Sequence, residues 1–317
     1  MDSDSIKRVS VLGLGTMGHG IAQTMAMAGC QVCGYDAATE ARAGLHNRVQ
    51  ANLQQMLAVG LVEENAIAAA LERITVCDSE ADALTDAQFV TEAVAEDLAL
   101  KQELFRRIED SVDSATILAS NTSSYPMTEV SVNMQHPERA VVTHWFNPPH
   151  VIPVVEVVPG EKTSDATAQT AYEFLNRIGK TAIRINQELP GFLVNRVQVA
   201  MFREVLDLLD RNVASPEDID RAIRGSAGLR LAALGPLAII DYAGLDITSR
   251  VYENLAPDLR SDAELPNCIA KTVAAGNLGA KTGQGIFAHP AEQREQAIAA
   301  RDRLYLELVK LTGNASN

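Results

Sequence analysis

The stretch that decides the fold is RVSVLGLGTMGHGIAQTMAMAGCQVCGYD, residues 8–36. An apolar run over residues 8–12 predicts a strand, and residues 21–28 predict a helix. Between them the sequence reads Gly13, Leu14, Gly15, Thr16, Met17, Gly18, which is the G-x-G-x-x-G spacing of a dinucleotide-binding turn. The first glycine permits the tight turn, the second lets the backbone approach a pyrophosphate, and the third lets helix and strand pack closely. We therefore expect residues 13–18 to bind the phosphates of a dinucleotide.

The acidic residue that follows indicates which dinucleotide binds. A second strand, predicted over residues 31–35, ends in Asp36, eighteen residues after Gly18. A carboxylate at this place accepts hydrogen bonds from the ribose hydroxyls and repels a 2′-phosphate. The cofactor is therefore predicted to be NAD rather than NADP, and a glycine-rich turn without a ligand is the disfavoured alternative.

The following segments predict an α/β domain and then a helical one. Residues 37–59 and 63–73 have helical spacing around a stop at Gly60, and short strands are expected at residues 74–76, 89–92 and 116–119 with helices between them. This alternation is typical of a doubly wound, mostly parallel sheet. From residue 166 the pattern is chiefly helical. We expect an α/β domain over residues 1–187 and an all-α domain over residues 188–317.

The stretch VVTHWFNPPHVIPVVEVV, residues 141–158, contains one imidazole at a strand end and one carboxylate. Two β-branched runs, residues 141–143 and 154–158, are joined by a connection that contains several prolines. A chain that folds back there brings His144 and Glu156 together as a general base and the group that orients it. The alternative is an ordinary hydrogen-bonded core histidine. The other nearby imidazoles, His19 and His150, are left outside the catalytic set.

Ligands of doubly wound sheets bind beyond the carboxyl ends of the strands. Residues 92–96, residues 120–123 and His144 all follow predicted strands. We therefore expect these three strand ends to meet at one cleft.

Composition excludes several classes of protein. The 317 residues carry a net charge of −14 without a run of Lys and Arg, which argues against nucleic acid as a partner. The N-terminus lacks the features of a signal peptide, no apolar run is long enough to span a membrane, and the four cysteines do not form a disulfide framework. Cys30 and Cys33 form a C-x-x-C, but at a strand start they point to opposite faces, so redox chemistry is not expected. We expect a cytoplasmic protein with a small-molecule substrate and no metal site.

Taken together, the motifs resemble those of the L-3-hydroxyacyl-CoA dehydrogenase family over nearly the whole chain. They stand in family order: GLGTMG with Asp36, EAVAEDLALK (residues 92–101), SNTSS (120–124), H-x-x-N-P at His144, VVEVV at Glu156, PGFLVNR (190–196), GP…DYAGLD (235–246) and KTGQGIF (281–287). The resemblance implies an NAD-binding Rossmann domain, a helical domain that forms a homodimer, and a catalytic His–Glu pair.

The resemblance also implies roles for individual residues. His144 would be the base that takes the alcohol proton, Glu156 its orienter, and Ser123 and Asn195 would hold the reacting oxygen. The residues expected along the cofactor, besides those of the turn, are Glu96, Lys101, Asn121 and Lys281. The alternatives are that Ser123 only bonds a turn backbone and that Asn195 only caps a helix.

The sequence departs from the fatty-acid members of the family in the two predicted helices of residues 37–59 and 63–73, which form a helical hairpin after the second strand. Those members carry lysines there that meet the phosphates of coenzyme A, whereas here no lysine occurs between Lys7 and Lys101. The sequence after His144 resembles that of the members that oxidise free small acids. These are the L-gulonate dehydrogenase (lambda-crystallin) group, carnitine dehydrogenase and the pyridine-carboxylate dehydrogenase of vitamin B6 degradation. We therefore favour a compact hydroxy acid or related alcohol over a 3-hydroxyacyl-CoA.

Two other classes open with similar sequence or bind the same cofactor. The 6-phosphogluconate and 3-hydroxyisobutyrate dehydrogenases also begin with GLGxMG, but their G-x-x-G-x-G-x-x-x-K motif is missing here. A non-enzymatic, crystallin-like NAD-binding protein is the other alternative. The intact His144 and Glu156 argue against it.

Overall fold

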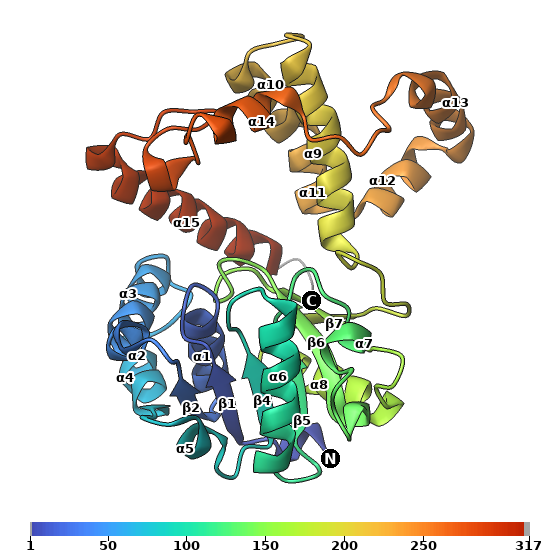
Figure 1. Cartoon of the computed structure of the whole chain (residues 1–317). Helices are drawn as coiled ribbons and strands as arrows, with labels where there is room; N and C mark the ends of the chain where they lie inside the picture. The colour runs from blue at the N-terminus through green and yellow to red at the C-terminus, as the bar shows by residue number, and fades with distance from the viewer. Residues whose placement is uncertain (1, 314–317) are drawn as a thin grey trace. The chain divides into compact units, whose positions relative to one another are not determined.

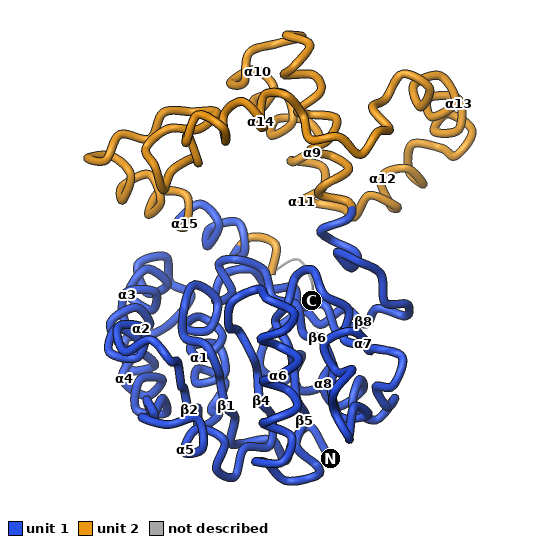
Figure 2. The backbone as a smooth tube through the Cα atoms, viewed as in Figure 1, with its two compact units in different colours: residues 1–196, 303–310 blue, residues 197–302, 311–317 orange. Residues whose placement is uncertain are grey.

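The computed structural model describes residues 2–313, which divide into two compact units (Figures 1 and 2). Of the described residues, the first unit comprises 2–196 together with 303–310, and the second comprises 197–302 together with 311–313. The long C-terminal helix α15 (Ala291–Gly313) therefore contributes residues to both units.

The first unit is built on one sheet of eight strands in the order β3-β2-β1-β4-β5-β6-β7-β8. The strands are β1 (Arg8–Leu12), β2 (Gln31–Tyr35), β3 (Ile74–Val76), β4 (Phe89–Glu92), β5 (Ile117–Ser120), β6 (Ala140–Trp145), β7 (Val154–Val158) and β8 (Thr181–Arg184). Neighbouring strands are parallel except for the antiparallel pair β6–β7. Strand order reverses between β1 and β4, so the carboxyl ends of these strands form the switch point at which such sheets bind ligands.

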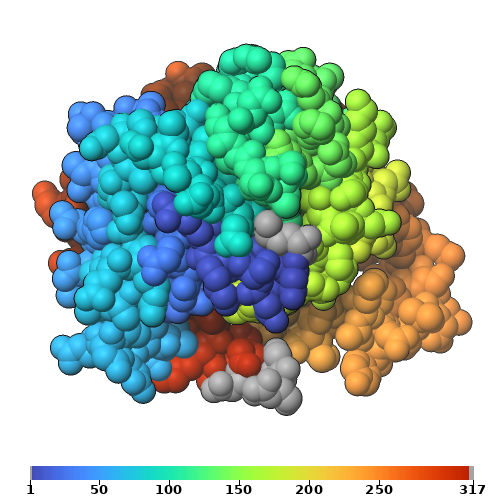
Figure 3. Space-filling view, turned by 90° about the horizontal axis from the view of Figure 1, so that it is seen from below, coloured from blue at the N-terminus to red at the C-terminus, as the bar shows by residue number. Residues whose placement is uncertain are grey.

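Helices cover both faces of this sheet. Side chains of α1 (Gly18–Met27), α3 (Leu45–Ala58), α4 (Glu64–Glu72) and α8 (Asp165–Arg177) pack into one hydrophobic core with β1 and β2. Those of α5 (Glu80–Leu84), α6 (Leu98–Ile108) and α7 (Met127–Val130) form a second core on the opposite face. The short α2 (Thr39–Ala43) precedes α3, and the 3-10 turns are η1 (Ser3–Ser5), η2 (Glu109–Ser111) and η3 (Pro137–Arg139). In Figure 3 the N-terminal segment lies in the middle of the face at the amino ends of the parallel strands.

The predicted doubly wound, mostly parallel sheet and the helical region after it are confirmed, with small shifts of element ends. The strand predicted at residues 116–119 is Ile117–Ser120. The predicted first helix of the hairpin is interrupted at Gly44, between α2 and α3. Strand β6 extends to Trp145, so His144 lies inside a strand rather than after it. All six residues of β6 are buried, which a two-sided cover of helices requires.

The second unit consists of helices that bury little of their apolar surface within it. They are α9 (Val194–Asp210), α10 (Pro216–Ile223), a π-helical turn η4 (Arg224–Gly228), α11 (Leu229–Ala233), α12 (Pro236–Ala243), α13 (Leu245–Leu255), η5 (Ala256–Asp258), α14 (Asn267–Ala274), η6 (Ala280–Thr282) and most of α15. Large side chains such as Leu237 (77% exposed), Tyr242 (83%) and Tyr252 (72%) are exposed to solvent. Of the hydrophobic residues described between 197 and 302, only Ile219 is buried.

Across residues 2–313, no single helix has both the length and the apolar character needed to cross a membrane. One bent pair, Pro216–Ala233 with Pro236–Ala243, meets the length and composition test together, with an angle of 97° at its break.

Candidate active site

The glycine turn of residues 13–18 fits a bound dinucleotide. A Cβ on Gly13, whose φ is +93°, would lie 2.4 Å from the Ala93 carbonyl oxygen, and a Cβ on Gly18 would lie 1.7 Å from that of Gly13. These two glycines are required by the packing of the turn itself. At Gly15 a Cβ would meet nothing within 4 Å. The space beside Gly15 is thus open for a pyrophosphate, and the turn leads directly into the N-terminus of α1.

The side chain of Asp36, directly after β2, is oriented by hydrogen bonds from two backbone N–H groups, one of them in the glycine turn. Its Oδ2 accepts a hydrogen bond from the Leu14 N–H at 2.7 Å, and its Oδ1 accepts one from the Ala38 N–H at 2.8 Å. Each carboxylate oxygen retains a lone pair for a ribose hydroxyl. The side chain is therefore oriented for the contact with adenosine ribose that the sequence predicts.

His144 and Glu156 meet across the antiparallel pair β6–β7. The two residues are direct partners in the register, and Nδ1 of His144 lies 2.7 Å from Oε2 of Glu156. Both side chains are almost fully buried, at 5% and 1% exposure. The carboxylate fixes the neutral tautomer in which Nδ1 carries the proton, so Nε2 has a free lone pair. The predicted juxtaposition is confirmed, while the catalytic role of the pair stays a prediction.

The second oxygen of Glu156 holds the start of α9. Oε1 accepts hydrogen bonds from the backbone N–H groups of Leu193 at 3.0 Å and Val194 at 2.9 Å. These two bonds orient the carboxylate of Glu156 and connect it to the N-terminus of α9. Sequence reasoning missed these donors because they depend on the local backbone, in which Gly191 and Phe192 both have positive φ.

Two aromatic rings enclose the imidazole of His144. The ring of Phe146 lies 4.4 Å from it and that of Phe192 lies 5.4 Å from it, measured between centroids. Phe192 is 2% exposed. The aromatic walls limit rotation of the imidazole and restrict water around it. The only signal in the sequence was that both residues stand in motifs next to catalytic candidates.

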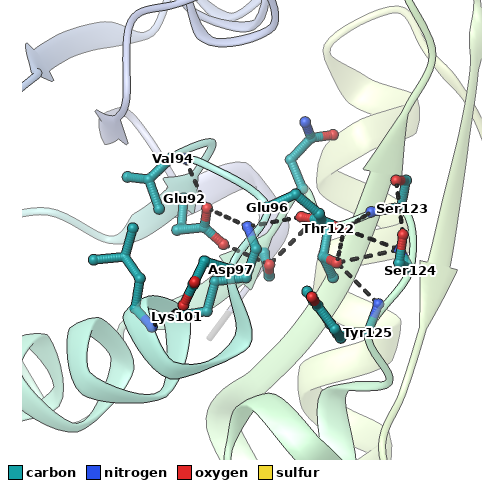
Figure 4. Close-up of polar contacts among 12 residues, drawn as sticks. Glu92, Val94, Glu96, Asp97, Lys101, Thr122, Ser123, Ser124 and Tyr125 are labelled. Atoms are coloured by element: carbon teal, nitrogen blue, oxygen red, sulfur yellow. Dashed lines mark hydrogen bonds and ion pairs between the residues drawn. The ribbon is translucent and has the colours of Figure 1, made fainter. Parts of the chain in front are cut away.

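Ser123 lies in a turn after β5 that is clamped by Glu96, as Figure 4 shows. Oε1 of Glu96 accepts hydrogen bonds from the Thr122 hydroxyl at 2.6 Å and from the N–H groups of Ser123 and Ser124 at 3.0 and 3.1 Å. Burial opposes ionisation of Glu96, but the bonds from Thr122 and Lys101 outweigh it and hold its pKa below the usual value. Glu96 is thus a charged anchor for the turn that carries Ser123.

Lys101 is buried beneath this turn. Its Nζ lies 2.7 Å from Oε1 of Glu92 and 3.2 Å from Oε2 of Glu96, with only 1% of its side chain exposed (Figure 4). Glu92 also accepts bonds from the Ser120 hydroxyl at 2.6 Å and the Val94 N–H at 2.7 Å. In the structure Lys101 therefore pairs with two carboxylates, and its predicted contact with NAD stays a prediction.

Three further residues were predicted to contact the substrate or NAD: Asn195, Asn121 and Lys281. Nδ2 of Asn195, in the first turn of α9, lies 3.4 Å from the Ser123 carbonyl oxygen, so these two residues are neighbours. Oδ1 of Asn121 accepts a hydrogen bond from the Trp145 N–H at 2.9 Å. Lys281 is exposed in η6 of the second unit. The contacts of Asn121 and Lys281 with NAD stay predictions.

The arginines of the helical region after β2 are occupied by backbone carbonyls. Arg42 donates to Asp36, Arg48 donates to Leu14 and Ala41, and Arg73 donates to Ala69. One cation that sequence reasoning missed lies at the tip of this region: Nζ of Lys310, from α15, donates to the Val59 carbonyl at 3.0 Å. Its approach could not be read from the sequence because the two residues are 251 positions apart.

Comparisons with known proteins agree over both parts of the chain. Residues 8–188 match the family described as 3-hydroxyacyl-CoA dehydrogenase, NAD binding domain, and residues 191–289 match the C-terminal domain of 3-hydroxyacyl-CoA dehydrogenase.

Relatives with different named substrates match over nearly their full lengths. The chain is 35% identical to 5-formyl-3-hydroxy-2-methylpyridine 4-carboxylate 5-dehydrogenase of Mesorhizobium japonicum, covering 94% of this chain and 96% of the relative. It is 34% identical to L-carnitine dehydrogenase of Streptomyces coelicolor, covering 98% and 96%. It is 37% identical to a probable 3-hydroxybutyryl-CoA dehydrogenase of Bacillus subtilis, covering 89% and 97%.

A solved structure is similar along the whole chain. The crystal structure of a 5-formyl-3-hydroxy-2-methylpyridine 4-carboxylic acid 5-dehydrogenase, an NAD+ dependent dismutase, matches with a TM-score of 0.88 and 34% identity, covering 97% of this chain and 99% of the other.

Proposed function

Because this chain belongs to the 3-hydroxyacyl-CoA dehydrogenase family and is an NAD-dependent oxidoreductase acting on CH–OH donors, we propose that it oxidises a small hydroxy acid or related alcohol with the His144–Glu156 pair as base. The observation that carries this proposal is the pair itself: a buried imidazole with Nδ1 held by a carboxylate at 2.7 Å and Nε2 left free.

Oxidation of a secondary alcohol removes a proton from the hydroxyl oxygen and a hydride from the carbon that bears this hydroxyl. Nε2 of His144 accepts the hydroxyl proton, and Glu156 stabilises the imidazolium that results. NAD, when bound, supplies the acceptor for the hydride. Ser123 and Asn195, which are neighbours in the structure, hold the reacting oxygen. Since Glu96 accepts a hydrogen bond from the backbone N–H of Ser123, the backbone that carries this hydroxyl is held in place.

A compact substrate is supported by the charges near the hairpin. A coenzyme A tail needs local cations in a protein with a net charge of −14. The arginines there donate to carbonyls, as described above, and α3 between Leu45 and Ala58 contains no lysine. The similarity to enzymes named for a pyridine carboxylate and for carnitine supports the same conclusion.

The second candidate is a 3-hydroxyacyl-CoA dehydrogenase proper. The 37% identity to the Bacillus subtilis protein favours it, and so does Lys310, whose ammonium reaches the hairpin tip. A single surface cation attracts a phosphate only weakly in physiological salt.

The test compares kcat/KM for 3-hydroxybutyryl-CoA with that for small secondary alcohols that carry a carboxylate, with NAD present. The proposal predicts efficient oxidation of a free acid and poor use of the CoA ester. Lys310→Ala should leave the free-acid activity unchanged. Efficient use of the CoA ester, with a KM that rises in salt and in Lys310→Ala, would instead establish the second candidate.

We propose further that the second unit forms a homodimer, as the family resemblance implies. Its helices expose many large apolar side chains, among them Leu229 at 68% and Leu237 at 77%, and exposed apolar surface of this extent marks an interaction site. Sedimentation of the purified protein as a monomer at micromolar concentration would contradict this. The cytoplasmic location stays a prediction.

A further inference from the structure

Two histidines outside the catalytic pair lie together beside the cofactor turn. His19 is in the first turn of α1, immediately after Gly18, and His150 is in the connection between β6 and β7 that begins just after His144. Their ring centroids are 6.3 Å apart. Both side chains are partly exposed, so each remains accessible to a ligand.

The segment between β6 and β7 packs directly against α1, and this packing fixes the position of His150. A Cβ on Gly20 would lie 2.7 Å from Cγ of Pro149 and 3.0 Å from Nδ1 of His150. Below the connection, Nζ of the buried Lys180 donates to the carbonyl groups of Pro149 at 2.6 Å and Ile152 at 3.0 Å. The segment that carries His150 is therefore packed against the first turn of α1 and anchored by Lys180.

Hydrogen bonds fix opposite tautomers in the two rings. Nδ1 of His19 lies 2.7 Å from the Gly15 carbonyl oxygen, so this nitrogen carries the proton and Nε2 is an acceptor. Nδ2 of Asn52 donates to Oε1 of Gln23 at 3.0 Å and approaches Nδ1 of His150 at 3.4 Å. Nδ1 of His150 is therefore the acceptor, and its Nε2 carries the proton. Among residues 2–313 neither Nε2 atom has a hydrogen-bond partner.

Both imidazoles are neutral at physiological pH. Burial, with smaller contributions from His19 and Lys180, lowers the pKa of His150 to about 4. Burial, assisted by Arg48, also lowers the pKa of His19 despite its bond to Gly15. The pair thus offers one acceptor and one neutral donor. A phosphate or carboxylate would face a lone pair on His19 without gaining a positive charge, so an anion is disfavoured here.

We propose that His19 and His150 bind an uncharged hydroxyl group of the substrate, distal to the carbon that is oxidised, and so select hydroxylated small acids. A hydroxyl donates to Nε2 of His19 and accepts from Nε2 of His150. Two nitrogens that share one oxygen lie up to about 5.6 Å apart, and a separation of 6.3 Å between the ring centroids brings both imidazoles within reach of a single hydroxyl. The inference rests on the proposed function, because it assigns part of the same substrate.

The test uses pairs of 3-hydroxy acids of different chain lengths, each pair with and without a terminal hydroxyl. For at least one pair, the unmodified protein should prefer the diol in kcat/KM by about tenfold, the value of one or two neutral hydrogen bonds. His19→Phe and His150→Phe should each reduce that preference about five- to tenfold. His150→Asn, which keeps a donor, should restore part of it. The control is His136→Phe, because His136 is 63% exposed and pairs with Glu138.

The outcomes separate this inference from the proposed function. If none of the free acids is oxidised by the unmodified protein, both fail. If they are oxidised and both Phe variants keep the unmodified preference, the inference alone is wrong. A change in the Kd of NAD with no change in preference would assign the two histidines to the cofactor and also overturn it.

Discussion

Oδ1 of Asn121 accepts a hydrogen bond from the backbone N–H of Trp145 at 2.9 Å. The bond joins the carboxyl end of β5 to the residue after His144, so it connects the Ser123 turn with the strand that carries the base. Asn121→Ala should lower kcat about tenfold through loss of this bond, and Asn121→Asp, which keeps the acceptor, should retain most of the activity. Steady-state kinetics and the Kd of NAD are the measurements. An unchanged kcat in Asn121→Ala would contradict the positioning role of this bond, whereas a weaker Kd for NAD would support the predicted contact of Asn121 with the cofactor.

Glu156→Gln tests the orientation of the imidazole. The amide oxygen can still accept from Leu193 and Val194, but the amide NH₂ then faces Nδ1 of His144 and favours the tautomer with the proton on Nε2. That tautomer cannot accept the alcohol proton. We expect kcat to fall by roughly three orders of magnitude while thermal stability changes little. A kcat within about fivefold of the unmodified protein would show that the carboxylate does not set the tautomer.

Asp36 should control the choice of dinucleotide. Its carboxylate, held by Leu14 and Ala38, would repel a 2′-phosphate. We expect kcat/KM to favour NAD over NADP by at least about a hundredfold, equal to roughly 2.7 kcal/mol. Asp36→Ser combined with Ala37→Arg should narrow this ratio. Equal use of both dinucleotides by the unmodified protein would contradict the assignment.

Stability should fall in acid through His150. Its pKa of about 4 in the folded protein is below the ordinary value of 6.5, so the native state binds fewer protons than the unfolded state between those values. Stability is therefore unaffected by this group above about pH 6.5 and is lost as the pH falls towards 4. His150→Phe removes this loss. Chemical denaturation at several pH values should show the variant gaining about 1 kcal/mol relative to the unmodified protein for each pH unit between 6.5 and about 4. A constant difference would contradict this pKa.

The sequence was sufficient where chemistry follows from local pattern. The glycine turn and Asp36 stand within one strand–turn–helix–strand unit, and the pairing of His144 with Glu156 follows from two β-branched runs joined by a connection with several prolines. In each case the residues are close in sequence, so the regular geometry of strands brings them together.

The contacts that were missed depend on tertiary structure. Lys101 lies on an amphipathic helix, where a lysine is normally exposed, and its burial results from the carboxylate of Glu92 on a neighbouring strand. The donors from Leu193 and Val194 require positive φ at Phe192, which is uncommon for an aromatic residue. Lys310 reaches the hairpin from the far end of the chain. Periodicity and spacing contain no information on such approaches.

The most direct test of the central claim is single-turnover reduction of NAD by the best secondary alcohol, in unmodified protein and in His144→Ala. We expect a rate lower by two to four orders of magnitude in the variant, the usual contribution of a general base, with the Kd of NAD unchanged. We also expect the remaining rate of the variant to rise with pH, as hydroxide replaces the imidazole. A variant that reduces NAD at close to the unmodified rate would contradict the assignment of His144 as the base.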